Sequence, residues 1–168
     1  QDRRTAAITL FGNLFPMHDF VNSRYVMLWG INIFGANEGL SEPRGLMEAR
    51  DSGCKVVVVD PTFTQTAAKA DEWIPIKPGG DGAMALAMCR EIIDNNLYDD
   101  NFVANYCEGF AGFSKHLREK NYTPKWAEPI CGVPADTISR LAHEFASTKP
   151  AMSTMFKGAG YYTNGADA

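Results

Sequence analysis

The sequence predicts an α/β fold, in which an open, mostly parallel sheet is covered by helices on both faces. Two apolar runs, at residues 25–30 and 55–59, are continuous rather than alternating, which is typical of strands buried on both sides. A helical pattern lies between them, so the three segments predict a strand–helix–strand unit with parallel strands and a right-handed crossover. The predicted sheet is therefore Rossmann-like.

The remaining strands are shorter or less distinct. A third strand is expected at about residues 152–156. A short strand at 73–76 is expected at an edge of the sheet, because Pro75 cannot donate a ladder hydrogen bond. A weaker candidate is 7–10.

The first two helices have recognisable ends. Ser41 can cap a helix that extends to about Gly53, a natural stop. Asp81 opens the second helix, where it can act as the cap.

Two later helices follow the same reasoning. Asp99 caps a short helix that ends at about residue 106, and a longer helix starts at Pro134 or Asp136. Arg140 and Glu144 lie one turn apart on the longer helix, where we expect a solvent-facing ion pair.

The composition is that of a soluble globular chain. Its 168 residues carry a formal net charge of −4, and hydrophobic residues make up 45% of them. A chain of this length can bury a sizeable core, which argues against disorder, collagen, a coiled coil and a disulfide-stapled miniprotein. The negative charge argues against nucleic-acid binding, and no apolar run approaches the roughly 20 residues that a membrane helix needs. We expect a single domain over residues 1–168.

The ends of the chain suggest a piece of a longer protein. The chain begins at Gln1 with neither a start methionine nor a charged-then-apolar leader, and residues 158–165 form a glycine-rich, loop-like stretch. We therefore expect an internal fragment.

The cysteines and histidines predict no metal site. No C-x-x-C motif occurs, which argues against a zinc ribbon and against a complete iron–sulfur motif. We expect the four thiols to be buried or partly buried and to pack as small hydrophobes; they are Cys54, Cys89, Cys107 and Cys131. The three histidines lack metal-ligand spacing, and no nucleophilic triad is present.

Three loops are expected to form a ligand site, because open α/β sheets bind ligands beyond the carboxyl ends of their strands. They are residues 29–36, 60–64 and 77–81. In the first loop, Gly30 permits close approach of a ligand, and the Asn32 amide can donate and accept hydrogen bonds. The loop lacks the G-x-G-x-x-G pattern of a dinucleotide fingerprint.

The carboxylates of the other two loops each have two interpretations. Asp60 can accept a hydrogen bond from a ribose hydroxyl, or it can start a turn with Pro61. Asp81 can cap the helix that follows, or it can accept hydrogen bonds from a guanine edge.

Several segments, in this order, resemble the molybdopterin oxidoreductases of the dimethyl sulfoxide reductase family. They are Trp-Gly-Ile-Asn at 29–32, residues 49–61 ending in Val-Val-Val-Val-Asp-Pro, residues 70–81 ending in Lys-Pro-Gly-Gly-Asp, and residues 96–103, 122–127 and 132–135. Each segment alone is a weak signal, but their succession is specific.

The resemblance implies a domain that binds the guanine dinucleotide tail of a molybdopterin cofactor. The implied cofactor-binding residues are Trp29, Gly30, Asn32, Ala36, Asp60, Pro61, Thr62, Thr64, Gly79, Gly80 and Asp81. The molybdenum ligand and the iron–sulfur motif are expected in other parts of the parent chain, so this fragment is expected to be inactive alone. The implied partners are those other domains and an iron–sulfur electron-transfer subunit, in an enzyme of anaerobic respiration.

The chain departs from the family pattern at three places. Thr62 stands where the family often has Arg, Ile33 where it often has Pro, and Gly80 where Thr is commoner. The main alternative is a cofactor-less structural domain, as in the large iron–sulfur subunit of a respiratory NADH dehydrogenase. A third interpretation, an NAD-dependent module, is weaker because the glycine fingerprint is missing.

Overall fold

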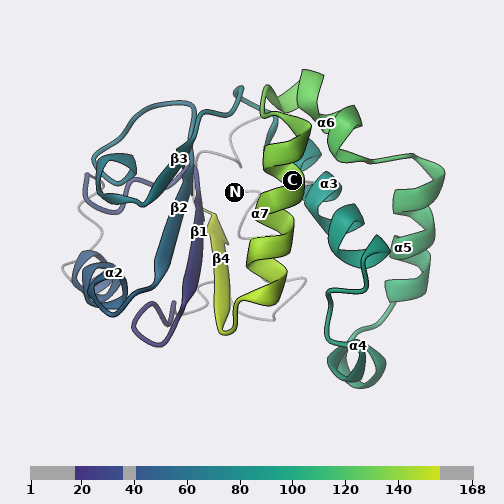
Figure 1. Cartoon of the computed structure of the whole chain (residues 1–168), viewed down its shortest axis with the longest axis horizontal. Coiled ribbons are helices and arrows are strands. Elements are labelled where there is room, and N and C mark those ends of the chain that lie inside the picture. Colours follow the sequence, from purple (N-terminus) through teal and green to yellow (C-terminus); the bar gives the residue numbers. More distant parts are fainter. Residues whose placement is uncertain (1–17, 36–40, 156–168) are drawn as a thin grey trace.

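The computed structural model describes residues 18–35 and 41–155, which form a parallel sheet covered on both faces (Figure 1). The strands are β1 (Tyr25–Trp29), β2 (Lys55–Val59), β3 (Glu72–Ile74) and β4 (Ala151–Met155). They lie in the order β3-β2-β1-β4, and every neighbouring pair is parallel. The predicted α/β class is confirmed, and the strand with Pro75 after it does lie at an edge.

The helices surround this sheet. They are α2 (Ser41–Asp51), the short 3-10 helix η1 (Ala67–Lys69), α3 (Asp81–Asp94), α4 (Asp100–Tyr106), α5 (Phe110–Glu119), α6 (Pro124–Cys131) and α7 (Ala135–Ser147). In Figure 1, α2 lies on one side of the sheet, and α3 and α7 lie on the other, with α4 and α5 farther out. None of the helices within the described residues is both long and apolar enough to cross a membrane.

Side chains of β1 and β2 alternate between two hydrophobic cores. Val26, Leu28, Val56 and Val58 point to the core under α2, whereas Met27, Trp29, Val57 and Val59 point to the core under α3, α6 and α7. The two cores explain why these strands are continuously apolar, since each face of the sheet must be covered.

The chain reverses its direction of travel across the sheet at β1. From β1 it passes through α2 to β2 and then to β3, and it later returns to place β4 on the other side of β1. The gap beyond the carboxyl ends of β1 and β4 is therefore a topological switch point, the place where open α/β sheets bind ligands.

Two predicted helix ends are confirmed in atomic detail. The N–H of Phe102 donates to the Asp99 carboxylate at the start of α4. After α2, Gly53 has a φ of +89°, and the Cys54 N–H donates to the Ala49 carbonyl, which together close the helix in a Schellman motif. The predicted cap at Ser41 involves residues before α2, which lie outside the described part, as does the candidate strand at 7–10.

The predicted cap at Asp81 is wrong. Gly80 occupies the N-cap position of α3 without a side-chain hydrogen bond, and Asp81 is the first helical residue. Asp81 therefore lies one residue after the cap position, from which a side chain would accept the N–H groups of the first turn. Its carboxylate lines a pocket instead.

Candidate functional site

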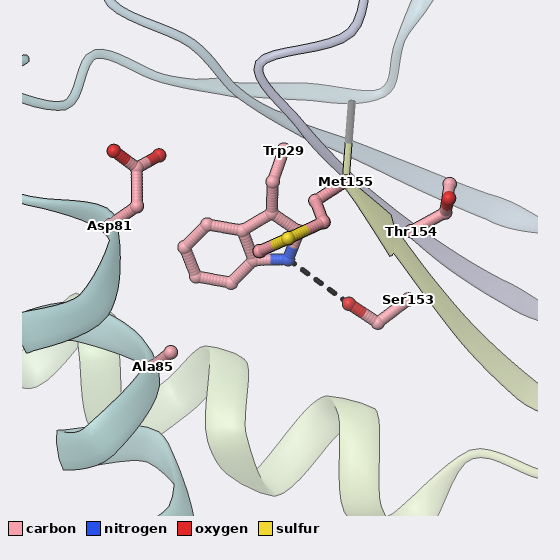
Figure 2. A pocket seen from close by; sticks show the side chains of 6 residues that line it. All are labelled: Trp29, Asp81, Ala85, Ser153, Thr154 and Met155. Carbon is pink, nitrogen blue, oxygen red and sulfur yellow. Dashed lines mark hydrogen bonds between the residues drawn. The ribbon is translucent and has the colours of Figure 1, made fainter. Parts of the chain in front are cut away.

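A pocket of about 230 Å³ lies at the topological switch point. It is lined by Trp29, Asp81, Ala85, Ser153, Thr154 and Met155, which come from β1, the start of α3 and the end of β4 (Figure 2). The sequence pointed to Trp29 and Asp81, but not to Ala85 or to the β4 residues. The strand order supplies the missing signal, because it places β4 directly beside β1.

The indole of Trp29 forms one wall of the pocket and is held in place by β4. Its N–H donates to the Ser153 hydroxyl oxygen at 3.1 Å. Figure 2 shows the Met155 side chain beside the same ring. The indole is thus buried and fixed before any ligand arrives, with 6% of its surface exposed.

Asp81 provides the negative charge of the pocket. It is 7% exposed, and Figure 2 shows its carboxylate across the pocket from Ser153. Burial raises the pKa of Asp81, its own backbone N–H opposes that shift, and the charge of nearby Asp60 raises the pKa further. Among the described residues, the carboxylate receives no hydrogen bond from another residue.

Asp60 adopts the turn role that was one of its two interpretations. Its carboxylate accepts the N–H of Thr62 at 2.8 Å, and its carbonyl accepts the indole N–H of Trp73 at 2.8 Å. Pro61 and Thr62 are exposed next to it. Thr64 accepts the N–H of Ala67 at 3.1 Å, which starts η1.

The side-chain oxygen of Asn32 accepts hydrogen bonds within the protein. It accepts the hydroxyl of Thr66 at 2.9 Å and the N–H of Thr66 at 3.3 Å. This contact joins the loop after β1 to the loop after β2. The sequence did not reveal Thr66, which lies far along the chain from Asn32. Ala36, the last predicted residue of the first loop, lies outside the described residues.

The glycines of the predicted site are required by the conformation and the close packing of the backbone. Gly30 and Gly79 have φ values of +54° and +82°, which favour glycine. A Cβ at Gly80 would lie 2.6 Å from the Cα of Cys131, so α6 approaches too closely for any side chain.

The structure thus gathers part of the predicted site. Trp29 and Asp81 line the pocket, Asp60 lies near enough to shift the pKa of Asp81, and Asn32 lies in the loop that continues from Trp29. Pro61, Thr62, Thr64, Gly79 and Gly80 belong to adjacent loops at the same edge of the sheet and do not line this pocket.

No metal centre is present among the described residues. They contain no group of three or more His, Cys, Asp or Glu side chains that could hold a metal ion. All four cysteines are free thiols, with Cys54 and Cys131 buried and Cys89 half-buried. The expectation of burial is wrong for Cys107, which is exposed because it follows α4, a helix that buries none of its residues.

Comparison with known proteins identifies the family. The family model of the molybdopterin oxidoreductases matches residues 6–163. The chain belongs to this family. The resemblance inferred from the ordered segments is therefore confirmed, and the chain is a molybdopterin oxidoreductase domain.

Two similar proteins are named as reductases. This molybdopterin oxidoreductase domain is 40% identical to the molybdopterin-containing subunit of thiosulfate reductase from Salmonella typhimurium, over 86% of the chain and 19% of that protein. It is 37% identical to dimethyl sulfoxide reductase DmsA from Escherichia coli, over 88% of the chain and 20% of that protein. The chain therefore spans about a fifth of the length of these relatives.

A solved structure shares the fold. Acetylene hydratase from Pelobacter acetylenicus matches with a TM-score of 0.81 at 33% identity, over 89% of this chain and 20% of that one. Proteins that are similar to this chain are thus named for different reactions. The domain alone fixes the family and not the substrate.

Proposed function

We propose that this domain binds the guanine nucleotide end of a molybdopterin guanine dinucleotide, with Asp81 as the residue that recognises the base. The observation that supports this most is the position of Asp81: the residue is 7% exposed, it lines the pocket at the switch point, and its carboxylate receives no hydrogen bond from another described residue. A carboxylate that lines an open pocket is available to accept hydrogen bonds from a ligand.

Guanine supplies the donors that this acceptor lacks. Its N1–H and N2–H groups lie side by side, so one carboxylate can accept both hydrogen bonds. Adenine presents an acceptor nitrogen at the equivalent position, which would face the Asp81 carboxylate without a proton between them. The Trp29 indole offers an apolar wall against which a purine can lie.

Other residues of the same edge would hold the rest of the tail. Gly30 and Gly79 allow the backbone to approach a ligand closely. Asp60, which follows β2 at the same edge, would accept a hydrogen bond from a ribose hydroxyl in addition to the Thr62 N–H. When bound, the cofactor supplies the redox chemistry, and the chain supplies binding and orientation. Under this proposal the domain alone is catalytically silent. In a parent protein as long as the similar reductases, the other four-fifths would supply the metal ligand and the iron–sulfur motif.

Equilibrium titration with GMP and AMP tests the base recognition. The unmodified chain should prefer GMP, and Asp81→Asn should lower GMP affinity about tenfold or more, because a hydrogen bond to a charged group contributes about 1.5–3 kcal/mol. Asp136→Asn is the matched control, since Asp136 is also in the first turn of a helix but is exposed and lies on α7.

The pH dependence gives an independent readout. Recognition needs the ionised carboxylate, and burial raises the pKa of Asp81 above its ordinary value of 3.8. GMP affinity should therefore fall as the pH drops through that raised pKa. Equal affinity for GMP and AMP, or no effect of Asp81→Asn, would contradict the proposal, and absence of any binding would favour a cofactor-less structural domain.

A further inference from the structure

In the described parts of the two loops that follow β1 and β2, three hydrogen bonds join one loop to the other. Two run from the Thr66 hydroxyl and the Thr66 N–H to the side-chain oxygen of Asn32, at 2.9 and 3.3 Å. The third runs from the Phe34 N–H to the Thr66 hydroxyl oxygen at 3.2 Å. The Thr66 hydroxyl therefore donates to one residue of the first loop and accepts from another.

This contact, which we call the Asn32–Thr66 clamp, is closely packed. Thr66 is 1% exposed, so its hydroxyl is shielded from competing water. A Cβ added at Gly35 would lie 2.1 Å from the Asn32 side-chain nitrogen, so a side chain at this position would displace the amide. The Gly35 N–H also donates to the Asn32 carbonyl at 3.1 Å, which closes the turn.

The clamp sits next to the residues that face the proposed ligand. Trp29 lines the pocket and Gly30, with a φ of +54°, leads from it into the clamped turn. The oxygen of Asn32 is engaged by Thr66, so this atom holds the loop in shape. Loops that are fixed in advance bind more tightly, because less freedom is lost when the ligand arrives.

We propose that Asn32 and Thr66 are positioning residues, which fix the loop after β1 in the conformation that receives the nucleotide, and that the Asn32 oxygen contacts Thr66 in place of the ligand. The inference rests on the proposed function for its ligand. It is an alternative to the expectation that Asn32 bonds the cofactor directly, and it assigns a role to Thr66.

The test compares substitutions at Thr66 in two measurements on the same protein: amide hydrogen exchange and affinity for GMP. Thr66→Val keeps the shape but removes the hydroxyl. We expect exchange at the Phe34 amide to rise about tenfold and GMP affinity to fall about three- to tenfold, the range expected for one net hydrogen bond. Thr66→Ser restores the hydroxyl and should restore both values. Thr137→Val on α7 is the control for the Thr-to-Val change and should alter neither.

A double-mutant cycle separates positioning from direct contact. If Asn32 acts through Thr66, then Asn32→Ala combined with Thr66→Val should weaken GMP binding no more than about twofold beyond the stronger single variant. Fully additive losses would overturn the proposal, since they would show that Asn32 touches the nucleotide itself.

A single-variant comparison decides the same point if Thr66→Val does not fold. A positioning Asn32 predicts that Asn32→Ala raises exchange at the Thr66 amide and lowers GMP affinity together. A loss of affinity with unchanged exchange would overturn the proposal. Failure of the unmodified chain to bind GMP would contradict the proposed function and with it the positioning role, whereas an unprotected Phe34 amide in a chain that binds GMP would contradict the clamp alone.

Discussion

Gly80 and Asp81 are neighbours in the chain but satisfy different requirements. Gly80 leaves room for the backbone of Cys131 in α6, whereas Asp81 places a buried carboxylate in the pocket. Sequence patterns placed both residues at the start of a helix and at a ligand loop. These patterns could not show that α6 approaches Gly80, because the contact joins residues about fifty positions apart.

Asp81→Asn should stabilise the unliganded chain at neutral pH. Burial raises the pKa of Asp81 in the folded state, so the folded chain binds more protons than the unfolded chain between pH 3.8 and the raised pKa. Stability therefore falls as the pH rises through that window, and the ionised carboxylate is a net cost above it. Thermal unfolding should show a higher Tm for Asp81→Asn at pH 7.

The same comparison at low pH supplies the check. Below pH 3.8 the carboxyl is protonated in both folded and unfolded chains, and the difference in Tm should disappear. A lower Tm for Asp81→Asn at pH 7 would show that the carboxylate stabilises α3 instead, which is the capping role that the geometry excludes.

Gly80→Ala should destabilise the fold by about 1–3 kcal/mol, because the new Cβ would meet backbone and Cβ atoms of Cys131 at 2.6 and 2.8 Å. Chemical denaturation measures this loss. Gly112→Ala on α5 is the matched control, since a Cβ there meets nothing within 4 Å, and it should be neutral or stabilising. Equal effects of the two substitutions would contradict the close approach of α6.

At the scale of elements, the strands and the helices with clear caps could be predicted, while α5 and α6 could not. Helix α6 starts favourably, with Thr123 as its cap and Pro124 in the first turn, but it contains Pro129 in its interior, where proline predicts a break. Helix α5 starts after Gly109 and contains Gly112. Packing explains α6, since Ala127 and Cys131 are fully buried in the core under α3 and α7.

The pair of Arg140 and Glu144 is part of a larger charge network at the amino-terminal edge of the sheet. The Lys55 ammonium lies 2.6 Å from the Glu144 carboxylate and 3.3 Å from that of Glu72, which also pairs with Arg140. The Tyr25 hydroxyl donates to Glu144 at 3.2 Å. The prediction of a solvent-facing pair missed this network, because its other members lie on β1, β2 and β3.

Glu144→Gln should destabilise the chain at pH 7 by on the order of 1 kcal/mol, the upper range for exposed pairs, because several charges share this carboxylate. Burial raises the pKa of Glu144, but hydrogen bonds from Lys55 and Arg140 outweigh it and lower the pKa below 4.5. The stabilisation is therefore present above pH 4.5 and is lost as the pH falls through the lowered pKa.

Denaturation at pH 7 and at pH 3 measures this dependence. Glu48→Gln provides the control, since its pair with Arg44 is exposed and joins only two residues of α2. Equal losses for Glu144→Gln and Glu48→Gln at pH 7 would contradict a stabilising role for the network.

At the scale of the whole molecule, the order of the strands determines the site. The sequence predicted a parallel sheet and the edge at which a ligand binds, but not that β4 would lie beside β1. Only that arrangement brings Ser153 and Met155 to the wall formed by Trp29. Strand order depends on how α3 and α7 pack on the face of the sheet that carries Met27, Trp29, Val57 and Val59. Local sequence patterns do not encode this long-range packing.

The most direct test of the central claim is amide and indole NMR of the labelled chain during titration with GMP. We expect saturable shifts at the Trp29 indole N–H and at the amides of Gly30 and Asp81, with smaller shifts for AMP at the same concentrations. Shifts confined to the outer helices α4 and α5, or the same response to both nucleotides, would contradict a guanine site at the carboxyl edge of the sheet.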